Sequence, residues 1–533
     1  MVNISAFEIL GPIMVGPSSS HTAGALRIAL VARSLGPQHL ARVDFTLYNS
    51  FAKTYRGHGT DRALVAGMLG FASDDERVRD SFAHATDAGL IFSFSPASDE
   101  EGAGRHPNTV TCVMTGTDGH AVSVTGESLG GGRIRISQVD GVNVELSGDY
   151  PTLFISHRDH PGVLAALTGT LAGASVNIAT INTFRKERGG MAYTIIELDE
   201  SASTKELEGL RKLPKVISVC VVEIPGTIPI SADAEMTLDY NNGHELLKLC
   251  QNKKLSIGAL TRAREIELSS GDVKAVDAQM ERVLVAMRGQ TTEPIDHPRP
   301  SLGGLIGGQA RAVFDKADIF AAPLMGSTLT RAAAYAMATL ERSASMGVIV
   351  AAPTAGSSGV VPGAVLAVSE ALGANDQQIK EALWCAAGIG AIMTRNATVA
   401  GAEGGCQAEV GSAAAMAAAA VAQLLGATPS VALSAASTAI DNLLGLVCDP
   451  VRGLVEHPCQ GRNVIGVSAA LSSAQLALSG VLDPLPFDEV VEAMRQVGAA
   501  LPATLRETAL GGLAAAPSAR SARNRCTICG LCD

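Results

Sequence analysis

The sequence predicts a multidomain α+β protein with an N-terminal α/β domain over residues 1–148, a ferredoxin-like domain over 149–224 and an all-α domain over 238–515. Three patterns predict this division. The N-terminal domain shows strand-like alternation with Asp-Gly and Gly-Gly turns. The middle domain has a β-α-β-β-α-β order, and the third domain has helical periodicity. Residues 225–237 are expected to form a linker and residues 516–533 a Cys-rich tail.

The N-terminal domain combines helix and strand patterns. Apolar residues at helical spacing run from Ala25 to Leu35, and Ser20 or Thr22 is expected to cap this helix. Residues 43–50 alternate as a strand does, and residues 108–146 contain several strands joined by hairpin turns. This mixture predicts the α/β class of the domain.

The middle domain has six expected elements. Strands are predicted over TLFISHRD, VNIATINTFRK, GGMAYTIIELD and VISVCVVEI, and helices over Pro161–Gly173 and Thr204–Lys212. Their β-α-β-β-α-β order is the ferredoxin-like plan.

The third domain is expected to be almost wholly helical, with Gly- and Pro-rich loops between its helices. One stretch, residues 410–440, carries no charge and is long enough to cross a membrane. It is mostly Ala, however, and is broken at Thr428-Pro429. Because membrane insertion depends on denser Leu, Ile and Phe, the stretch predicts two buried helices instead.

Composition excludes several function classes. The 533 residues include 41 Lys and Arg against 52 Asp and Glu, a formal charge of −11. An acidic chain without a basic run is a poor partner for nucleic acid or an anionic membrane. The N-terminus shows no basic start followed by an apolar core, so no signal peptide is expected and the protein is predicted to be cytoplasmic.

Cysteine is the first candidate for chemistry, because thiols in a large cytosolic protein are metal ligands or catalytic groups more often than disulfides. Cys406, Cys448 and Cys459 each lie at a helix–loop junction beside Gly or Pro. Buried structural thiols explain this pattern equally well. A zinc site with His457 as the fourth ligand is a further alternative, although no pair of these residues has the spacing of a zinc ribbon.

The tail carries three more thiols. Cys526, Cys529 and Cys532 form C-x-x-C-x-x-C, a spacing that suits iron–sulfur or zinc ligation. An exposed, oxidisable tail is the alternative.

Several longer motifs together carry a resemblance. They are GPSSSHTAG (16–24), GHGTDRA (57–63), SLGGLIGG (301–308), APTAGSSGVVPG (352–363), NATVAGAEGGCQAEVGSA (396–413), LVCDPVRGLVEHPCQGRN (446–463) and LRETALGGLA (505–514). Across almost its whole length the chain resembles the iron–sulfur L-serine dehydratase (L-serine ammonia-lyase) family, with the beta and alpha portions fused. RDHPGVLAALTGTLAGASVNI (158–178) resembles an ACT domain.

The resemblance implies a [4Fe–4S] cluster on Cys406, Cys448 and Cys459, with the fourth iron open for substrate. It further implies that Cys532, just before the final Asp, can fold back onto that iron. The preceding segment SARNRCTICG departs from the usual tail and leaves open which tail thiol reaches the cluster. An open iron would act as a Lewis acid on the hydroxyl of L-serine, giving pyruvate and ammonia.

A base must also remove the Cα proton of the substrate. His21 in SSSHT and His58 in GHGTD are the candidates, since the unperturbed pKa of His lies nearest neutrality. The sequence does not decide between them.

Other polar residues are candidates for holding the substrate. The turn TAGSSG is rich in backbone N–H groups and could cradle a carboxylate, and its alternative is a helix cap. Arg462 and Asn463, which follow Cys459 in the sequence, could donate hydrogen bonds to substrate or to cluster sulfur. The substrate-binding set is Ser18, Ser19, Ser20, Thr22, Thr354, Gly356, Ser357, Arg462 and Asn463.

The ACT-like unit is expected to bind an effector, an amino acid or a cation, and a homodimer is expected. Two other classes stay open: an amino-acid-binding regulator with a structural metal site, and an electron carrier. A pyridoxal-phosphate route is disfavoured because it needs a Schiff-base lysine, and no Lys follows Lys380. Serine and threonine are not ranked as substrates.

Overall fold

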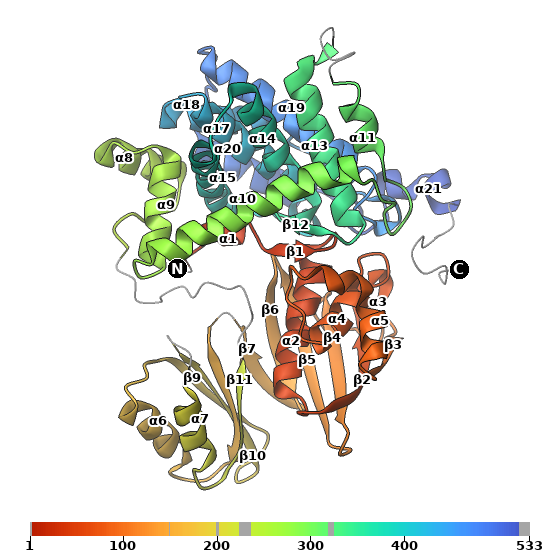
Figure 1. Cartoon of the computed structure of the whole chain (residues 1–533), viewed down its shortest axis with the longest axis vertical. Coiled ribbons are helices and arrows are strands. Elements are labelled where there is room, and N and C mark those ends of the chain that lie inside the picture. Colours follow the sequence, from red (N-terminus) through yellow and green to blue (C-terminus); the bar gives the residue numbers. More distant parts are fainter. Residues whose placement is uncertain (1–2, 149, 199–201, 223–235, 318–323, 522–533) are drawn as a thin grey trace. The chain divides into compact units, whose positions relative to one another are not determined.

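The computed structural model describes residues 3–148, 150–198, 202–222, 236–317 and 324–521 (Figure 1). Packing divides the chain into two units: Met1–Ser19 with Ala234–Asp533, and Ser20–Asp233. The residues up to Ser19 thus group with the helical part of the chain, which the sequence pattern did not anticipate. Most of the expected linker and the thiols Cys526, Cys529 and Cys532 lie outside the described residues.

A six-stranded sheet forms the first half of the Ser20–Asp233 unit. Its strand order is β3-β2-β4-β5-β6-β7, with β3 parallel to β2 and the other pairs antiparallel. The strands are β2 (Leu40–Leu47), β3 (Ile91–Pro96), β4 (Thr109–Gly116), β5 (Ala121–Gly130), β6 (Arg133–Val139) and β7 (Val142–Leu146). The expected strand near 43–50 and the hairpins over 108–146 are confirmed.

The helices of this half are α2 (Ala25–Leu35), α3 (Asn49–Thr54), α4 (Thr60–Met68), the short 3₁₀ helix η2 (Glu76–Asp80) and α5 (Ser81–Asp87). On β4, Val110, Cys112 and Met114 alternate with half-buried residues, as expected for a strand with one covered face. Helix α2 packs on this sheet, where Gly126 leaves room for the side chain of Ile28.

A π-helical turn, η1 (Ser19–Gly24), precedes α2. Helix α2 then begins after Gly24 without a side-chain cap, so the expected cap at Ser20 or Thr22 is wrong. The physical reason is that both side chains have other partners. Ser20 Oγ lies 2.9 Å from His21 Nδ1, and Thr22 Oγ1 donates to the His58 carbonyl at 2.7 Å.

The second half of this unit has the predicted β-α-β-β-α-β order, which is confirmed. Its elements are β8 (Thr152–Arg158), α6 (Val163–Gly173), β9 (Ile178–Arg185), β10 (Met191–Leu198), α7 (Thr204–Arg211) and β11 (Val216–Val222). The sheet order is β11-β8-β10-β9, all antiparallel. Leu167 and Leu171 of α6 pack on Leu153, Ile155 and Ile196 of the sheet.

The described residues of the other unit are helical apart from one short ribbon, in which β1 (Ile13–Val15) pairs antiparallel with β12 (Val348–Val350). Its α-helices are α1 (Ala6–Ile9), α8 (Gly243–Lys253), α9 (Ile257–Leu268), α10 (Val273–Asp296), α11 (Gln309–Phe314), α13 (Gly326–Ala344), α14 (Val360–Leu372), α15 (Asp376–Asn396), α16 (Gly401–Gly404), α17 (Ser412–Leu424), α18 (Pro429–Asp441), α19 (Cys459–Leu478), α20 (Phe487–Ala500) and α21 (Pro517–Ser521). Short turns are η3 (Ala355–Ser357), η4 (Gln407–Gly411), η5 (Val451–Gly453), η6 (Ala503–Leu505) and η7 (Gly512–Ala515).

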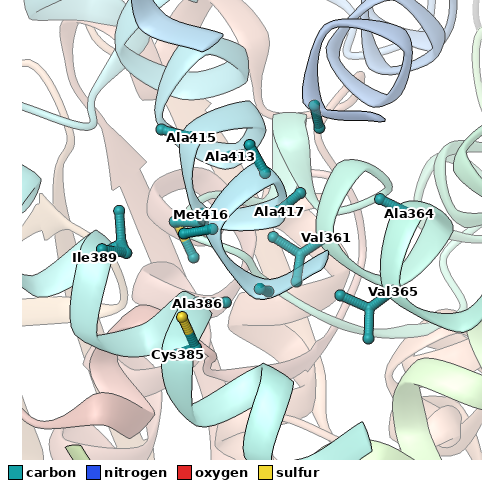
Figure 2. Packing of buried hydrophobic residues seen from close by; sticks show 14 of the residues in the cluster. Val361, Ala364, Val365, Cys385, Ala386, Ile389, Ala413, Ala415, Met416 and Ala417 are labelled. Atoms are coloured by element: carbon teal, nitrogen blue, oxygen red, sulfur yellow. The ribbon is translucent and has the colours of Figure 1, made fainter. Parts of the chain in front are cut away.

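Helix α17 lies at the centre of the helical unit, in contact with α14, α15, α18 and α19. Its residues from Ser412 to Ala422 are all buried, and most are Ala. Figure 2 shows Ala417 of this helix beside Val361 of α14, and Val365 of α14 and Ile389 of α15 belong to the same buried cluster. Small residues let helix axes approach closely, so the Ala content reflects tight packing around one central helix.

The uncharged stretch 410–440 is therefore two buried helices, α17 and α18, as predicted, and α18 begins at Pro429. Among the described residues, one helical segment, Ala355–Leu372, is long and apolar enough to cross a membrane, and 78% of it is buried in the protein. Burial of that extent is typical of a core helix.

A pair of helix glycines tests the tightness of this packing. A Cβ at Gly363 of α14 would lie 2.8 Å from the Ala332 carbonyl oxygen of α13, whereas a Cβ at Gly289 of α10 meets nothing within 4 Å. Gly363→Ala is expected to destabilise the helical unit by about 1–3 kcal/mol through overpacking. Gly289→Ala should stabilise it by about 0.5–1 kcal/mol, because Ala is the better helix former. Denaturant unfolding followed by circular dichroism measures both, and equal effects of the two substitutions would contradict the packing described here.

Candidate active site

Two buried thiols of the helical unit, Cys406 and Cys448, come together, and Cys459 lies near enough to interact electrostatically with Cys406. Cys406 directly precedes η4, Cys448 forms a β-bridge with Arg506, and Cys459 is the first residue of α19. All three are free and less than a tenth exposed. The Cys406 and Cys448 sulfurs and a carboxylate oxygen of Glu409 all lie within 4.8 Å of one another.

The electrostatics of these thiols suit a metal group. A hydrogen bond with Cys406, followed by burial, raises the pKa of the Cys448 thiol. Burial, followed by the charges of Cys406 and Glu409, raises the pKa of the Cys459 thiol well above its usual range. Thiolate is the ligand that iron–sulfur clusters use, and a bound metal cation would favour the thiolate form of these neighbouring thiols. The donor set therefore fits an iron–sulfur cluster.

Arg462 supplies one positive charge at the thiols. Its Nη1 donates to Cys406 Sγ at 3.5 Å and its Nη2 to Asp449 Oδ1 at 2.6 Å. Asp449 Oδ2 accepts the Leu513 N–H at 2.6 Å. The segment around Leu513 is thereby fixed beside Cys448.

Residues 505–507 form backbone hydrogen bonds with Cys448. The Cys448 N–H donates to the Leu505 carbonyl, and the Glu507 N–H donates back to the Cys448 carbonyl. Burial and the charge of Glu409 raise the pKa of the Glu507 carboxyl to about 8. The motif LRETALGGLA is thus a backbone support for the second thiol.

The turn expected to cradle a carboxylate forms η3, just before α14. Thr354 Oγ1 lies 3.1 Å from Ser357 Oγ, and Asn463 ties the turn to the third thiol. The Asn463 Nδ2 group donates to the carbonyls of Gly356 and Cys459, at 2.8 and 2.9 Å, and its Oδ1 accepts the Gly359 N–H at 3.0 Å. In this structure Asn463 therefore positions the turn against α19.

Two buried carboxylates fix the loop SLGGLIGG over the start of α19. Glu456 accepts the N–H groups of Gly303 and Leu305, at 2.6 and 2.9 Å. Glu341 accepts the N–H groups of Gly308 and Ala310 and the Gln460 amide, all at 2.9 Å. The loop packs Ile306 against Cys459.

Glu409 is a site residue that the sequence analysis missed. It lies on η4, a π-helical turn. Such turns are rare in proteins overall, but where they occur they are often at functional sites. Its Oε1 accepts the Thr354 hydroxyl at 2.8 Å, and its Oε2 lies 3.9 Å from Cys448 Sγ. The only signal for it in the sequence is its place three residues after Cys406.

A second group forms in the Ser20–Asp233 unit, where the rings of His21 and His58 lie 4.6 Å apart. His21 Nδ1 lies 2.9 Å from Ser20 Oγ, and its Nε2 lies 2.8 Å from Ser50 Oγ. Burial, with a smaller contribution from His58, lowers the pKa of His21 well below 6.5. His21 is therefore neutral near pH 7, the state that a base requires. Ser50 was not among the expected residues.

The structure thus gathers the expected residues into two groups. One contains Thr354, Gly356, Ser357, Arg462, Asn463 and the three thiols, and the other contains Ser20, His21, Thr22 and His58. Ser18 and Ser19 are buried in the N-terminal segment of the helical unit. Cys532 lies outside the described residues.

In the ferredoxin-like half, the turn before α6 has an acidic residue with fixed partners. The Asp159 carboxylate accepts the Gly189 N–H at 2.9 Å and pairs with Arg185 at 2.5 Å, and these contacts lower its pKa. Gly162, with φ of 90°, leads directly into α6.

Family comparisons agree with this division of the chain. Residues 252–514 match the serine dehydratase alpha chain, residues 5–139 the serine dehydratase beta chain, and residues 153–218 the AHAS small subunit-like ACT domain. The fold and the site therefore define a lyase that joins two catalytic portions and an ACT domain.

Individual relatives match either one part of the chain or nearly all of it. The L-serine dehydratase alpha chain of Peptoniphilus asaccharolyticus is 42% identical over 283 residues, 53% of this chain and 97% of that one. Its beta chain is 42% identical over 200 residues, 38% of this chain and 89% of that one. The L-serine dehydratase of Mycobacterium tuberculosis is 30% identical over 534 residues, 96% of this chain and 98% of that one.

The chain belongs to the L-serine dehydratase family, which is of the iron–sulfur type, and it carries the beta portion, the ACT domain and the alpha portion in one polypeptide.

The protonation state of His21 is directly measurable. With histidines labelled with ¹³C, the His21 ring signal is expected to titrate well below pH 6.5, since burial disfavours its charged form. His58→Gln should raise that midpoint, because His58 itself lowers the pKa of His21. A midpoint at or above 6.5 in the unsubstituted protein would contradict the buried, neutral state described here.

Proposed function

We propose that the chain converts L-serine to pyruvate and ammonia at a [4Fe–4S] cluster held by Cys406, Cys448 and Cys459. The observation that carries this proposal is the meeting of the buried thiols Cys406 and Cys448, with Cys459 near enough to interact electrostatically with Cys406, beside a polar turn and the Arg462 guanidinium. The family to which the chain belongs supports the same reaction.

When bound, the cluster would supply a Lewis-acidic iron that makes the substrate hydroxyl a better leaving group. The chain's own residues supply the rest of the chemistry. The turn Thr354–Ser357 offers backbone N–H groups to the substrate carboxylate, and Asn463 keeps this turn in place. Arg462, by donating to Cys406 Sγ, adjusts the charge of a cluster ligand.

A neutral imidazole, that of His21 or His58, would remove the Cα proton of the substrate. In His21 each ring nitrogen faces a serine hydroxyl, so the ring is oriented as a base should be. Ser20 and Thr22, from the same turn, are proposed to orient the histidines, and Ser18 and Ser19 to assist in binding the substrate carboxylate.

The reaction balances without an external oxidant or reductant. The proton leaves Cα, hydroxide leaves Cβ, and together they make water. The resulting enamine becomes an imine by proton transfer, and water hydrolyses the imine to pyruvate and ammonia.

Several further properties belong to the same proposal. Cys532 would be the tail thiol that takes the fourth ligand position in the resting enzyme. The ACT domain would bind an amino-acid or cation effector. A cytoplasmic location and a homodimer stay predictions.

Replacement of single thiols tests the ligand set. Cys406→Ala, Cys448→Ala and Cys459→Ala should each abolish the iron–sulfur absorption band and lower pyruvate formation by about 100-fold or more, since even outer-shell changes can cost that much. Iron analysis, the anaerobic absorption spectrum and a pyruvate assay measure these effects.

Cys385→Ala is the matched control, because Cys385 is equally buried in the same unit but lies in the apolar core of α15. It should keep its iron and its activity. Full activity and iron in any of the three ligand variants would remove that cysteine from the ligand set.

A further inference from the structure

We propose that Glu409 is the residue that receives the ammonium group of the substrate, and so makes the site specific for amino acids over other hydroxy acids. This inference rests on the proposed function, because it concerns the same thiol centre. It concerns a residue that the sequence pattern did not single out.

The position of Glu409 is the first argument. Its Oε1 accepts the Thr354 hydroxyl at 2.8 Å, and its Oε2 lies 3.9 Å from Cys448 Sγ. The carboxylate thus lies between the turn proposed to hold the substrate carboxylate and a thiol proposed to hold the cluster. In L-serine the amino group is bonded to the carbon that joins these two parts of the molecule, so an ammonium acceptor is needed between them.

The backbone also passes close to the carboxylate on two sides. A Cβ at Gly356 would lie 3.0 Å from Glu409 Oε1, and a Cβ at Gly401 would lie 2.6 Å from Oε2 and 3.3 Å from Cys448 Sγ. A side chain at either position would therefore crowd the carboxylate, and glycine lets the backbone approach it this closely. A preorganised acceptor of this kind loses little entropy when the substrate binds.

Charge is the third argument. Glu409 is half-buried, and a carboxylate that is partly withdrawn from water is costly unless a cation pairs with it. Arg462 is directed to Cys406 and Asp449 instead, and a cluster on three thiolates adds further negative charge. A carboxylate has about four acceptor sites, more than Thr354 and Cys448 use. The substrate ammonium would supply the missing positive charge through a charge-assisted hydrogen bond.

The other acids of the site suit this role less well, since Asp449 is already paired with Arg462. The Glu507 side chain accepts the Ala402 N–H, and its own N–H is bonded to the Cys448 carbonyl, so this residue supports the backbone around the second thiol.

The test compares two ligands that differ in the ammonium group. L-Serine carries hydroxyl, carboxylate and ammonium, and 3-hydroxypropanoate lacks the ammonium. Binding of each to the anaerobic holoenzyme is followed by the change in its absorption spectrum. Glu409→Gln keeps the acceptor for Thr354 and removes the charge, and Glu403→Gln, on the neighbouring helix α16, is the exposed control.

Glu409→Gln is expected to weaken L-serine binding by about 10- to 100-fold, the size of a lost charge-assisted hydrogen bond. Binding of 3-hydroxypropanoate should change by less than about 2-fold, and Glu403→Gln should change neither. If Glu409→Gln weakens both ligands equally, or neither, the inference is wrong. Loss of iron without added ligand would make Glu409 a cluster ligand and also overturn it.

Failure of the proposed function gives a different result. In that case the unsubstituted holoenzyme shows no spectral change with L-serine and makes no pyruvate, which overturns both proposals. Should Glu409→Gln fail to fold, Glu409→Asp keeps the charge one methylene farther away and should weaken L-serine selectively. Equal loss of both ligands in that variant contradicts the inference.

Discussion

Close packing around α17 is the constraint on which the rest of the helical unit depends. Because its buried residues are mostly Ala, α14 and α19 can both approach it, and these helices carry the polar turn and the third thiol. Gly466 of α19 marks one close approach, where a Cβ would lie 2.8 Å from Val410 of η4 and 2.9 Å from Val360 of α14. A larger residue there would push α19, and Cys459 at its start, away from the other two thiols. The placement of the thiols is therefore a consequence of helix packing, since no local cysteine motif brings them together.

The architecture was predictable because it rests on local periodicity. The hairpins over 108–146, the β-α-β-β-α-β order and the broken Ala-rich stretch each follow from patterns within a few residues. The β1–β12 ribbon was not predictable, because it joins segments hundreds of residues apart and each strand has three residues. The missing cap before α2 has a similar cause: Ser20 and Thr22 bond to histidines, one of which lies in a different segment of the chain.

The site was predictable in its residue types and much less in its roles. Motif matches identified the thiols, the turn and the histidines. Glu409 and Ser50 were missed because neither stands out in sequence, and only the fold places them within hydrogen-bonding distance of Thr354 and His21. Asn463 is a residue that the motifs did identify. It was expected to contact substrate or cluster, which stays a prediction, and the structure adds that its amide joins the Thr354–Ser357 turn to Cys459. Neighbouring residues in one motif can thus serve chemistry and scaffold separately.

The central claim is that the thiol centre both holds the cluster and receives the substrate. An anaerobic absorption spectrum of the full chain, titrated with L-serine while pyruvate is assayed in the same cuvette, tests this claim most directly. The account predicts a brown protein whose sulfur-to-iron band changes on addition of L-serine as pyruvate forms. A protein that remains colourless after anaerobic reconstitution and makes no pyruvate would contradict it, as would a cluster whose spectrum is unaffected by L-serine.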